Sequence, residues 1–180
     1  GDCGGDWVDE LTTPDPTTER GVRRVAAEAG WCSLHQAHGL PVHLFRLAGI
    51  YGPARNALQT VRQGTARRII KEGQVFSRTH VDDIVSVLEA SIKRPNPGAA
   101  YNVCDDDPAP PQDVVLYACE LLGVTPPPEI PFAEAELSEM ARSFYSESKR
   151  VSNTRIKQEL DVVLKYSNYR AGLEALLADS

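Results

Sequence analysis

A long helix followed directly by an apolar strand is the feature that most constrains the fold of this chain. Asp15 or Thr17 can cap the helix start, and Glu19 then faces the positive end of the helix dipole. Valine and alanine recur at helical spacing as far as Gly39, a residue typical of helix ends. Residues 40–53, "LPVHLFRLAGIYGP", predict a buried strand that runs into a Gly-Pro turn. A helix and strand in this order form half of a βαβ unit, which predicts an α/β fold with parallel strands.

The rest of the chain continues to alternate between helical and extended patterns. Residues 56–63 are helical in pattern and stop at Gly64, and residues 66–81 indicate a hairpin about Glu72-Gly73. Asp82 or Asp83 is expected to cap a helix over residues 84–93, and "AAYNVC" (99–104) predicts a short buried strand. Three further helices are expected, ending at Gly123, beginning near residue 152 and running from 169 to 178, with an extended proline-rich loop over 124–132.

Size and charge limit the class of protein. A chain of 180 residues with 42% hydrophobic residues can bury one core, and a net charge of −6 without a basic patch argues against a nucleic-acid partner. We find no apolar run long enough for a membrane span and expect a cytoplasmic location. The cysteines lie far apart without a neighbouring histidine cluster, so neither a metal site nor a disulfide framework is expected: Cys3, Cys32, Cys104 and Cys119.

Five segments, taken in order, resemble the extended short-chain dehydrogenase/reductase family, especially its atypical NAD-dependent epimerase/dehydratase-like members: "PDPTTERGVRRVAAE", "GLPVHLFRLAGIYGP", "FSRTHVDDIVSVLEAS", "AYNVCDDDPAPPQDVV" and "SKRVSNTRIKQEL". The resemblance implies the C-terminal part of a Rossmann-type parallel-sheet domain plus a small α+β substrate domain. It assigns residues 1–52 and 82–104 to the dinucleotide-binding domain, and residues 53–81 and 105–180 to the substrate-binding region. The family's Gly-rich phosphate-binding turn would lie upstream of residue 1, so an upstream segment or a homo-oligomer is expected to complete the sheet.

Two arginines occupy the family's catalytic positions. The family keeps a tyrosine and a lysine four residues apart on the helix after strand 5, and alignment on Gly21 and Glu28 places Arg20 and Arg24 there. Arginine does not deprotonate in proteins, so Arg20 cannot serve as the acid/base, whereas Arg24 keeps a cation that can bind ribose or phosphate. The alternative is that both are solvated helix arginines. The catalytic residue is therefore unknown.

A literal YxxxK motif occurs elsewhere, from Tyr145 to Lys149. It lies after the last expected sheet strand, where the family keeps its substrate domain, and we interpret it as a coincidence of composition.

The strand after Arg46 leads to further candidate residues. In the family, residues following this strand pass beside the nicotinamide, which here selects Leu47, Ala48 and Gly49 as cofactor-binding residues. Gly49 replaces an asparagine that touches substrate in sugar-nucleotide epimerases, a departure that weighs against a sugar-nucleotide substrate.

Arg78 and His80 lie two apart on a predicted strand and would share one face. The resemblance makes them candidate substrate-binding residues, with Arg78 reaching a substrate phosphate. An ion pair of Arg78 with Asp82, Asp83 or a nearby glutamate, and a structural role for His80, are the alternatives.

The resemblance implies an NAD(P)-dependent oxidoreductase or epimerase-like protein that acts on a small or nucleotide-linked substrate, with a degenerate Tyr/Lys dyad. The expected cofactor is NAD or NADP, and the expected partners are the dinucleotide and a small-molecule substrate. The alternative is a non-catalytic dinucleotide-binding or scaffold protein of the same fold.

Overall fold

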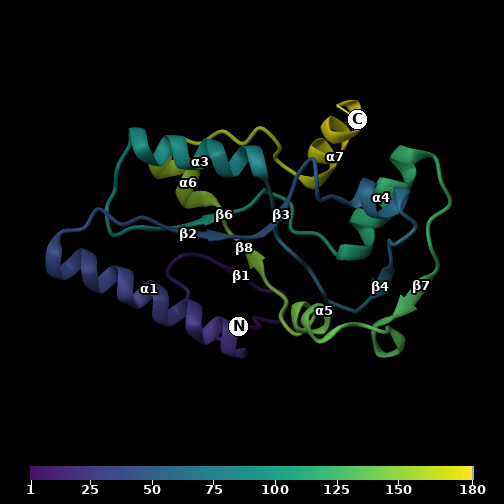
Figure 1. Ribbon diagram of the computed structural model, residues 1–180, viewed down its shortest axis with the longest axis horizontal. Coiled ribbons are helices and arrows are strands. Elements are labelled where there is room, and N and C mark those ends of the chain that lie inside the picture. Colours follow the sequence, from purple (N-terminus) through teal and green to yellow (C-terminus); the bar gives the residue numbers. More distant parts are fainter. Residues whose placement is uncertain (180) are drawn as a thin grey trace.

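The computed structural model describes residues 1–179, in which helices and short strands alternate along the chain (Figure 1). The helices are α1 (Glu19–His38), α2 (Ala57–Arg62), α3 (Val81–Lys93), α4 (Pro111–Leu122), the 3₁₀ helix η1 (Phe132–Glu134), α5 (Glu139–Phe144), α6 (Thr154–Leu160) and α7 (Tyr169–Ala178). The strands are β1 (Trp7–Val8), β2 (Leu44–Leu47), β3 (Gly49–Tyr51), β4 (Arg68–Ile70), β5 (Arg78–His80), β6 (Ala100–Val103), β7 (Glu129–Pro131) and β8 (Arg150–Val151).

Within residues 1–179 the strands form four two-stranded pairs, and all four pairs are parallel: β1 with β8, β2 with β6, β3 with β5, and β4 with β7. Parallel pairing needs a crossover between the partners, and helices supply it, as α2 does between β3 and β5. The expectation of an α/β fold with parallel strands is confirmed.

The hairpin predicted about Glu72-Gly73 is wrong. Gly73 does form a turn, with φ +71°, but β4 pairs with β7 and β5 pairs with β3. The chain does not fold back because Gln74 and Val75 are buried and held by distant residues: the Gln74 amide donates to the Glu147 carbonyl (2.7 Å) and the Val75 N–H to Ser148 Oγ (3.1 Å). The proline-rich loop expected over 124–132 likewise contains β7, the partner of β4.

Helix ends follow the sequence closely, with two changes of capping residue. Thr18 caps α1, since its side chain accepts the Gly21 N–H (3.1 Å), and Gly39 ends the helix in the left-handed conformation. At α3 the cap is His80, whose Nδ1 accepts the Asp82 N–H (3.2 Å). The predicted caps at Asp15 or Thr17 and at Asp82 or Asp83 are therefore wrong, because each helix starts at a different residue from the one that the pattern indicated.

Two apolar cores hold the chain together. In Figure 1, α1 lies on one side of the β2–β6 pair, and α3 and α6 lie on the other. The first core joins α3, β6 and α6 through Val87, Tyr101 and Ile156. The second joins α2, α4 and α7 at the opposite end of the molecule, and it contains Leu58, Ala118, Tyr169 and Leu173. The second core borders the pocket described below.

Helix α1 contacts the rest of the chain through half-buried residues such as Val25 and Cys32 and through one charged pair. None of its residues is buried, and its link to β2 is the Arg46–Glu28 pair, with Arg46 Nη2 2.8 Å from Glu28 Oε2. Another nitrogen of the same guanidinium, Arg46 Nη1, donates to the Glu10 carbonyl (3.2 Å).

No helix within residues 1–179 has both the length and the apolar character needed to cross a bilayer.

Candidate functional site

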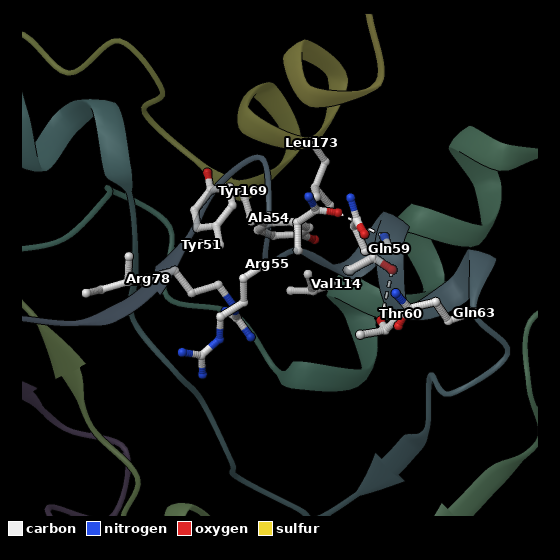
Figure 2. A pocket seen from close by; sticks show the side chains of 13 residues that line it. Tyr51, Ala54, Arg55, Gln59, Thr60, Gln63, Arg78, Val114, Tyr169 and Leu173 are labelled. Atoms are coloured by element: carbon white, nitrogen blue, oxygen red, sulfur yellow. Dashed lines mark hydrogen bonds between the residues drawn. The ribbon is translucent and has the colours of Figure 1, made fainter. Parts of the chain in front are cut away.

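A pocket of about 340 Å³ opens beside β3, between the turn that precedes α2 and the start of α7 (Figure 2). Tyr51, Val114, Tyr169 and Leu173 give it an apolar wall that continues the second core. Its polar lining groups come from the turn, α2 and β5: Arg55, Asn56, Gln59, Thr60, Gln63 and Arg78. An apolar wall with a few polar groups is the usual composition of a small-molecule pocket.

The turn before α2 forms a rigid rim. Gly52 and Arg55 exchange two backbone hydrogen bonds (3.0 and 3.1 Å), so the Pro53-Ala54 turn is closed. The Asn56 side-chain amide donates to the Gly52 carbonyl (2.8 Å), while its oxygen caps α2 by accepting the Gln59 N–H (3.0 Å). Gly52 itself leaves no room for a side chain, because a Cβ there would lie 2.7 Å from Val81 Cγ1.

Arg78 lies at the start of β5 and reaches the pocket. Its Nη1 donates to the carbonyls of Phe76 (2.8 Å) and Ala109 (3.0 Å), which fixes the guanidinium. The ion pair considered from sequence does not form, since Asp82 pairs with Lys165 (2.8 Å) and Asp83 accepts two backbone N–H groups. Burial lowers the pKa of Arg78, with Asp105 acting in the opposite direction. Arg78 stays a cation that is partly desolvated and available to an anion.

Asp105 is a buried residue beside the Arg78 backbone that sequence reasoning did not select, and it does not line the pocket. It follows the carboxyl end of β6, and its N–H donates to the Arg78 carbonyl (2.7 Å). The carboxyl group is buried, and its Oδ2 has no hydrogen-bond partner among the described residues. Burial raises the pKa of Asp105 to about 7, against the opposing influence of the Asp107 N–H and Arg78. Its position just after the carboxyl end of β6 could have marked it in the sequence, because ligands bind beyond the carboxyl ends of parallel strands.

His80 lies behind the pocket wall. The side chain is 2% exposed and does not line the pocket. Its ring packs edge-on against Tyr51 (5.1 Å between centroids) and contacts Tyr166 (4.3 Å). With Nδ1 used as the helix cap and Nε2 without a partner among residues 1–179, burial lowers the pKa of His80 and favours the neutral ring. This geometry corresponds to the structural role weighed above, and contact of His80 with a substrate stays a prediction.

The candidate cofactor residues 47–49 lie at the junction of β2 and β3. Leu47 ends β2 opposite Val103, and the Ala48 N–H donates to the Val103 carbonyl (3.1 Å). Gly49 then starts β3 directly opposite Arg78. The fold therefore brings the 47–49 segment and Arg78 together, although their contact with a cofactor or substrate stays a prediction.

Arg20 and Arg24 do not line the pocket beside β3. They border a separate shallow hollow at the start of α1, together with Glu19 and Arg23, and both are exposed. The second Tyr/Lys spacing does not form a helical pair: Tyr145 follows the end of α5 and packs on Phe132 (5.3 Å), whereas Lys149 pairs with Glu147 (2.6 Å). Across residues 1–179, no three His, Cys, Asp or Glu side chains are placed to hold a metal ion.

The arrangement can bind an anion joined to an apolar group. Arg78 offers a fixed guanidinium, and the Tyr51 side of the pocket offers apolar surface, whereas the buried Asp105 does not line the pocket. The pocket lining lacks a histidine or lysine, and the Tyr51 hydroxyl is buried without a partner in the described chain.

Comparison with known proteins finds relatives that are longer than this chain. No family model matches the chain. The protein YeeZ of Escherichia coli (strain K12) is 34% identical over 131 residues, which cover 71% of this chain and 44% of YeeZ. A functionally unknown conserved protein from Silicibacter pomeroyi DSS is 60% identical, with a TM-score of 0.95, over 100% of this chain and 63% of that protein. The chain thus spans less than two thirds of both relatives.

More distant solved structures share the fold. DesIV, a dTDP-glucose 4,6-dehydratase from Streptomyces venezuelae solved with NAD and TYD bound, is 14% identical with a TM-score of 0.79, covering 99% of this chain and 55% of DesIV. The UDP-glucuronic acid 4-epimerase from Bacillus cereus, solved with NAD, is 17% identical with a TM-score of 0.76, covering 97% and 54%. The chain has the mixed α/β architecture of these Rossmann-type dehydratases and epimerases.

Proposed function

We propose that this chain is the C-terminal part of an NAD(P)-dependent oxidoreductase or epimerase-like protein, with a degenerate Tyr/Lys dyad, that acts on a small or nucleotide-linked substrate. The observation that carries the proposal is the pairing of Gly49 with Arg78 in β3 and β5. This register sets the segment assigned to the cofactor beside the guanidinium assigned to the substrate. The pocket next to Arg78 has the mixed apolar and polar lining that such a substrate needs.

In this proposal the cofactor-binding and substrate-binding parts of the chain have the predicted domain boundaries. Residues 1–52 and 82–104 form the dinucleotide side, and residues 53–81 and 105–180 form the substrate side. The pocket residues outside β3 come from the second group. The Gln63 amide and the Thr60 hydroxyl can form hydrogen bonds to the polar edge of a ligand, while Val114 and Leu173 cover an apolar face.

The cofactor would be NAD or NADP, held on this chain by Arg24 and residues 47–49 and by the phosphate-binding turn expected upstream. The 47–49 segment fits a close ligand approach: Leu47 and Gly49 are exposed, and Gly49 carries no side chain. The dinucleotide would supply hydride transfer, and these residues would position it. Arg20 cannot carry the proton, so that role falls to a residue of the upstream segment or to water.

Dinucleotide binding is the direct test. NADH and NADPH fluorescence titrations would use this chain extended upstream to the length of its relatives. Saturable binding of one dinucleotide is expected, and Arg24→Ala should weaken it because a cation at the ribose or phosphate is lost. Arg94→Ala is the matched control, since Arg94 is an exposed arginine that pairs with Asp161 (2.8 Å) and does not border the hollow that contains Arg24. Equal affinities of the Arg24→Ala and wild-type proteins would reject the role of Arg24, and no binding by the extended wild type would reject the cofactor.

The second candidate function is a non-catalytic dinucleotide-binding or scaffold protein. The observation that favours it is the pair of arginines at the dyad positions, both exposed at the start of α1. Dinucleotide binding without turnover of any nucleotide-linked substrate would support this candidate over the enzyme.

A further inference from the structure

One guanidinium group connects helix α1, strand β2 and the N-terminal segment. Arg46 lies in β2, and its Nε and Nη2 are 3.1 Å and 2.8 Å from Glu28 Oε2 in α1. Its Nη1 donates to the Glu10 carbonyl (3.2 Å), on the segment that leads from β1 to α1 (Figure 1). Every nitrogen of the group has a partner, so charge-assisted hydrogen bonds to two other segments fix its orientation.

Glu10 extends the same set of contacts to strand β6. Its Oε1 accepts the N–H of Asn102 (2.7 Å), and Asn102 is the residue opposite Arg46 in the β2–β6 pair. Glu10 therefore binds both members of one cross-strand pair, the first through its carbonyl and the second through its carboxylate. The contacts form a closed ring, so a shift of the Arg46 side chain would disturb α1 and the edge of β6 together.

Glu28 lies at the middle of the side of α1 that faces the rest of the chain. The half-buried residues of α1 recur at helical spacing: Gly21, Val25, Glu28, Cys32 and His35. Glu28 is the one carboxylate among these five. Small and apolar side chains tolerate some sliding or rotation of a helix, whereas a charge-assisted hydrogen bond requires a narrow geometry. The contact between Glu28 and Arg46 therefore sets the rotation of α1 about its own axis.

We propose that Arg46 is a positioning residue that holds Arg24 and residues 47–49 at the spacing that the dinucleotide requires. The proposal rests on the proposed function, in which Arg24 and residues 47–49 bind the cofactor. Arg24 lies one helical turn before Glu28, and residues 47–49 directly follow Arg46, so the Arg46–Glu28 contact joins the two parts of the cofactor site. Groups that are held in place before binding lose less freedom when a ligand arrives, which favours affinity.

The test is fluorescence titration with NADH and NADPH of the chain extended upstream to the length of its relatives. Arg46→Met should raise the Kd of the dinucleotide that wild type binds about fivefold, as expected for residues coupled in one ion-pair network. Because Arg46 acts largely through Arg24, Arg46→Met should add no more than about twofold in an Arg24→Ala background, a dependence that lost stability alone does not produce. Glu28→Gln weakens the contact from the other side, and it should add little to Arg46→Met.

Arg68→Met is the matched control. Arg68 in β4 resembles Arg46, because it donates to a carboxylate of another segment, Glu129 (2.7 Å), and to a backbone carbonyl, that of Pro127 (3.2 Å). Its loss removes the same charge and a similar set of contacts outside both parts of the cofactor site, so the Kd should stay at the wild-type value. Thermal melts of all variants measure the loss of stability separately from the Kd.

Three results would overturn the positioning role while wild type still binds a dinucleotide: an unchanged Kd in Arg46→Met, equal losses in Arg46→Met and Arg68→Met, or full additivity of Arg46→Met with Arg24→Ala. No binding by the extended wild type rejects the proposed function, and the positioning role with it. If Arg46→Met does not fold, Glu28→Gln supplies the same comparisons, since the Glu28 side chain is only half-buried.

Amide hydrogen exchange of the 180-residue chain gives a readout without any cofactor. Arg46→Met should speed exchange along α1, because the helix loses its charged contact with β2, and Arg68→Met should not. Wild-type exchange rates in α1 of Arg46→Met would show that Arg46 does not hold the helix, and would overturn the proposal.

Discussion

The Tyr51 hydroxyl lies against the backbone of Gly172, so that a Cβ on Gly172 would meet the oxygen at 2.1 Å. Tyr51 is thereby positioned as the pocket wall by a glycine in the first turn of α7. Gly172→Ala should lower the free energy of unfolding by about 1–3 kcal/mol through overpacking, in spite of the helix propensity of alanine. The measurement is urea unfolding. Gly30→Ala in α1 is the control, because nothing lies within 4 Å of its Cβ, and it should be neutral or stabilising by up to ~1 kcal/mol.

Two adjacent aspartates should differ strongly in their effect on stability. Buried Asp83 accepts the N–H groups of Lys165 (2.6 Å) and Tyr166 (3.2 Å), which ties α3 to the segment before α7. Asp83→Ala leaves both donors without that acceptor and should cost about 1–3 kcal/mol in chemical denaturation. Half-exposed Asp82 pairs with the Lys165 side chain, and Asp82→Ala should cost no more than ~1 kcal/mol. Equal losses would contradict this account of the Asp83 carboxylate.

Asp105 should make stability fall as pH rises. The pKa of Asp105 is raised by burial to about 7 in the folded chain, and the unfolded value is about 3.9. Between these two pKa values the native state holds one more proton than the unfolded state. The resulting contribution to the free energy of unfolding is full below about pH 4 and is lost as pH rises through about 7. Asp105→Asn removes the titration and keeps an oxygen for the Asp107 N–H (3.4 Å). The difference in unfolding free energy between wild type and variant should change across pH 4–8, and a constant difference would refute the shift.

His80 should give the opposite slope on the acid side. Burial lowers the pKa of His80 below the usual 6.5, with Asp82 and Asp83 opposing the shift. A lowered native pKa means that the stability contribution is present above 6.5 and is lost as pH falls through the native value. Nitrogen-detected NMR of the imidazole rings should show His80 neutral at pH 6.5. A midpoint at or above 6.5 would show that the ring is not desolvated as the structure has it.

Local pattern was enough to predict six α-helices and the parallel character of the sheet, whereas η1 and α5 were not predicted. Gly39 and Gly123 end α1 and α4 as expected, and residues 169–178 form α7. These features depend on neighbours along the chain: periodic apolar residues and left-handed glycines. The hairpin failed because its outcome depended on contacts with Glu147 and Ser148, more than seventy residues away, which no local pattern contains.

The candidate site was predictable only where the rule about strand ends applied. Residues 47–49 were found through that rule and Arg78 through the family resemblance, and Gly49 lies opposite Arg78 in the structure. Asp105 obeys the same rule, but a run of three aspartates before a proline indicates a loop as readily as a site.

The pairing of β1 with β8 also sets an order of assembly. Trp7 lies opposite Arg150, with residues 9–149 between the two strands, and the Ser148 N–H donates to Asp2 Oδ1 (2.7 Å). Closing so long a loop loses chain entropy before these few contacts form, so the first ten residues are expected to dock last during folding. The same residues should open first under native conditions, and their amide hydrogens should exchange with solvent ahead of those in β6 or α6.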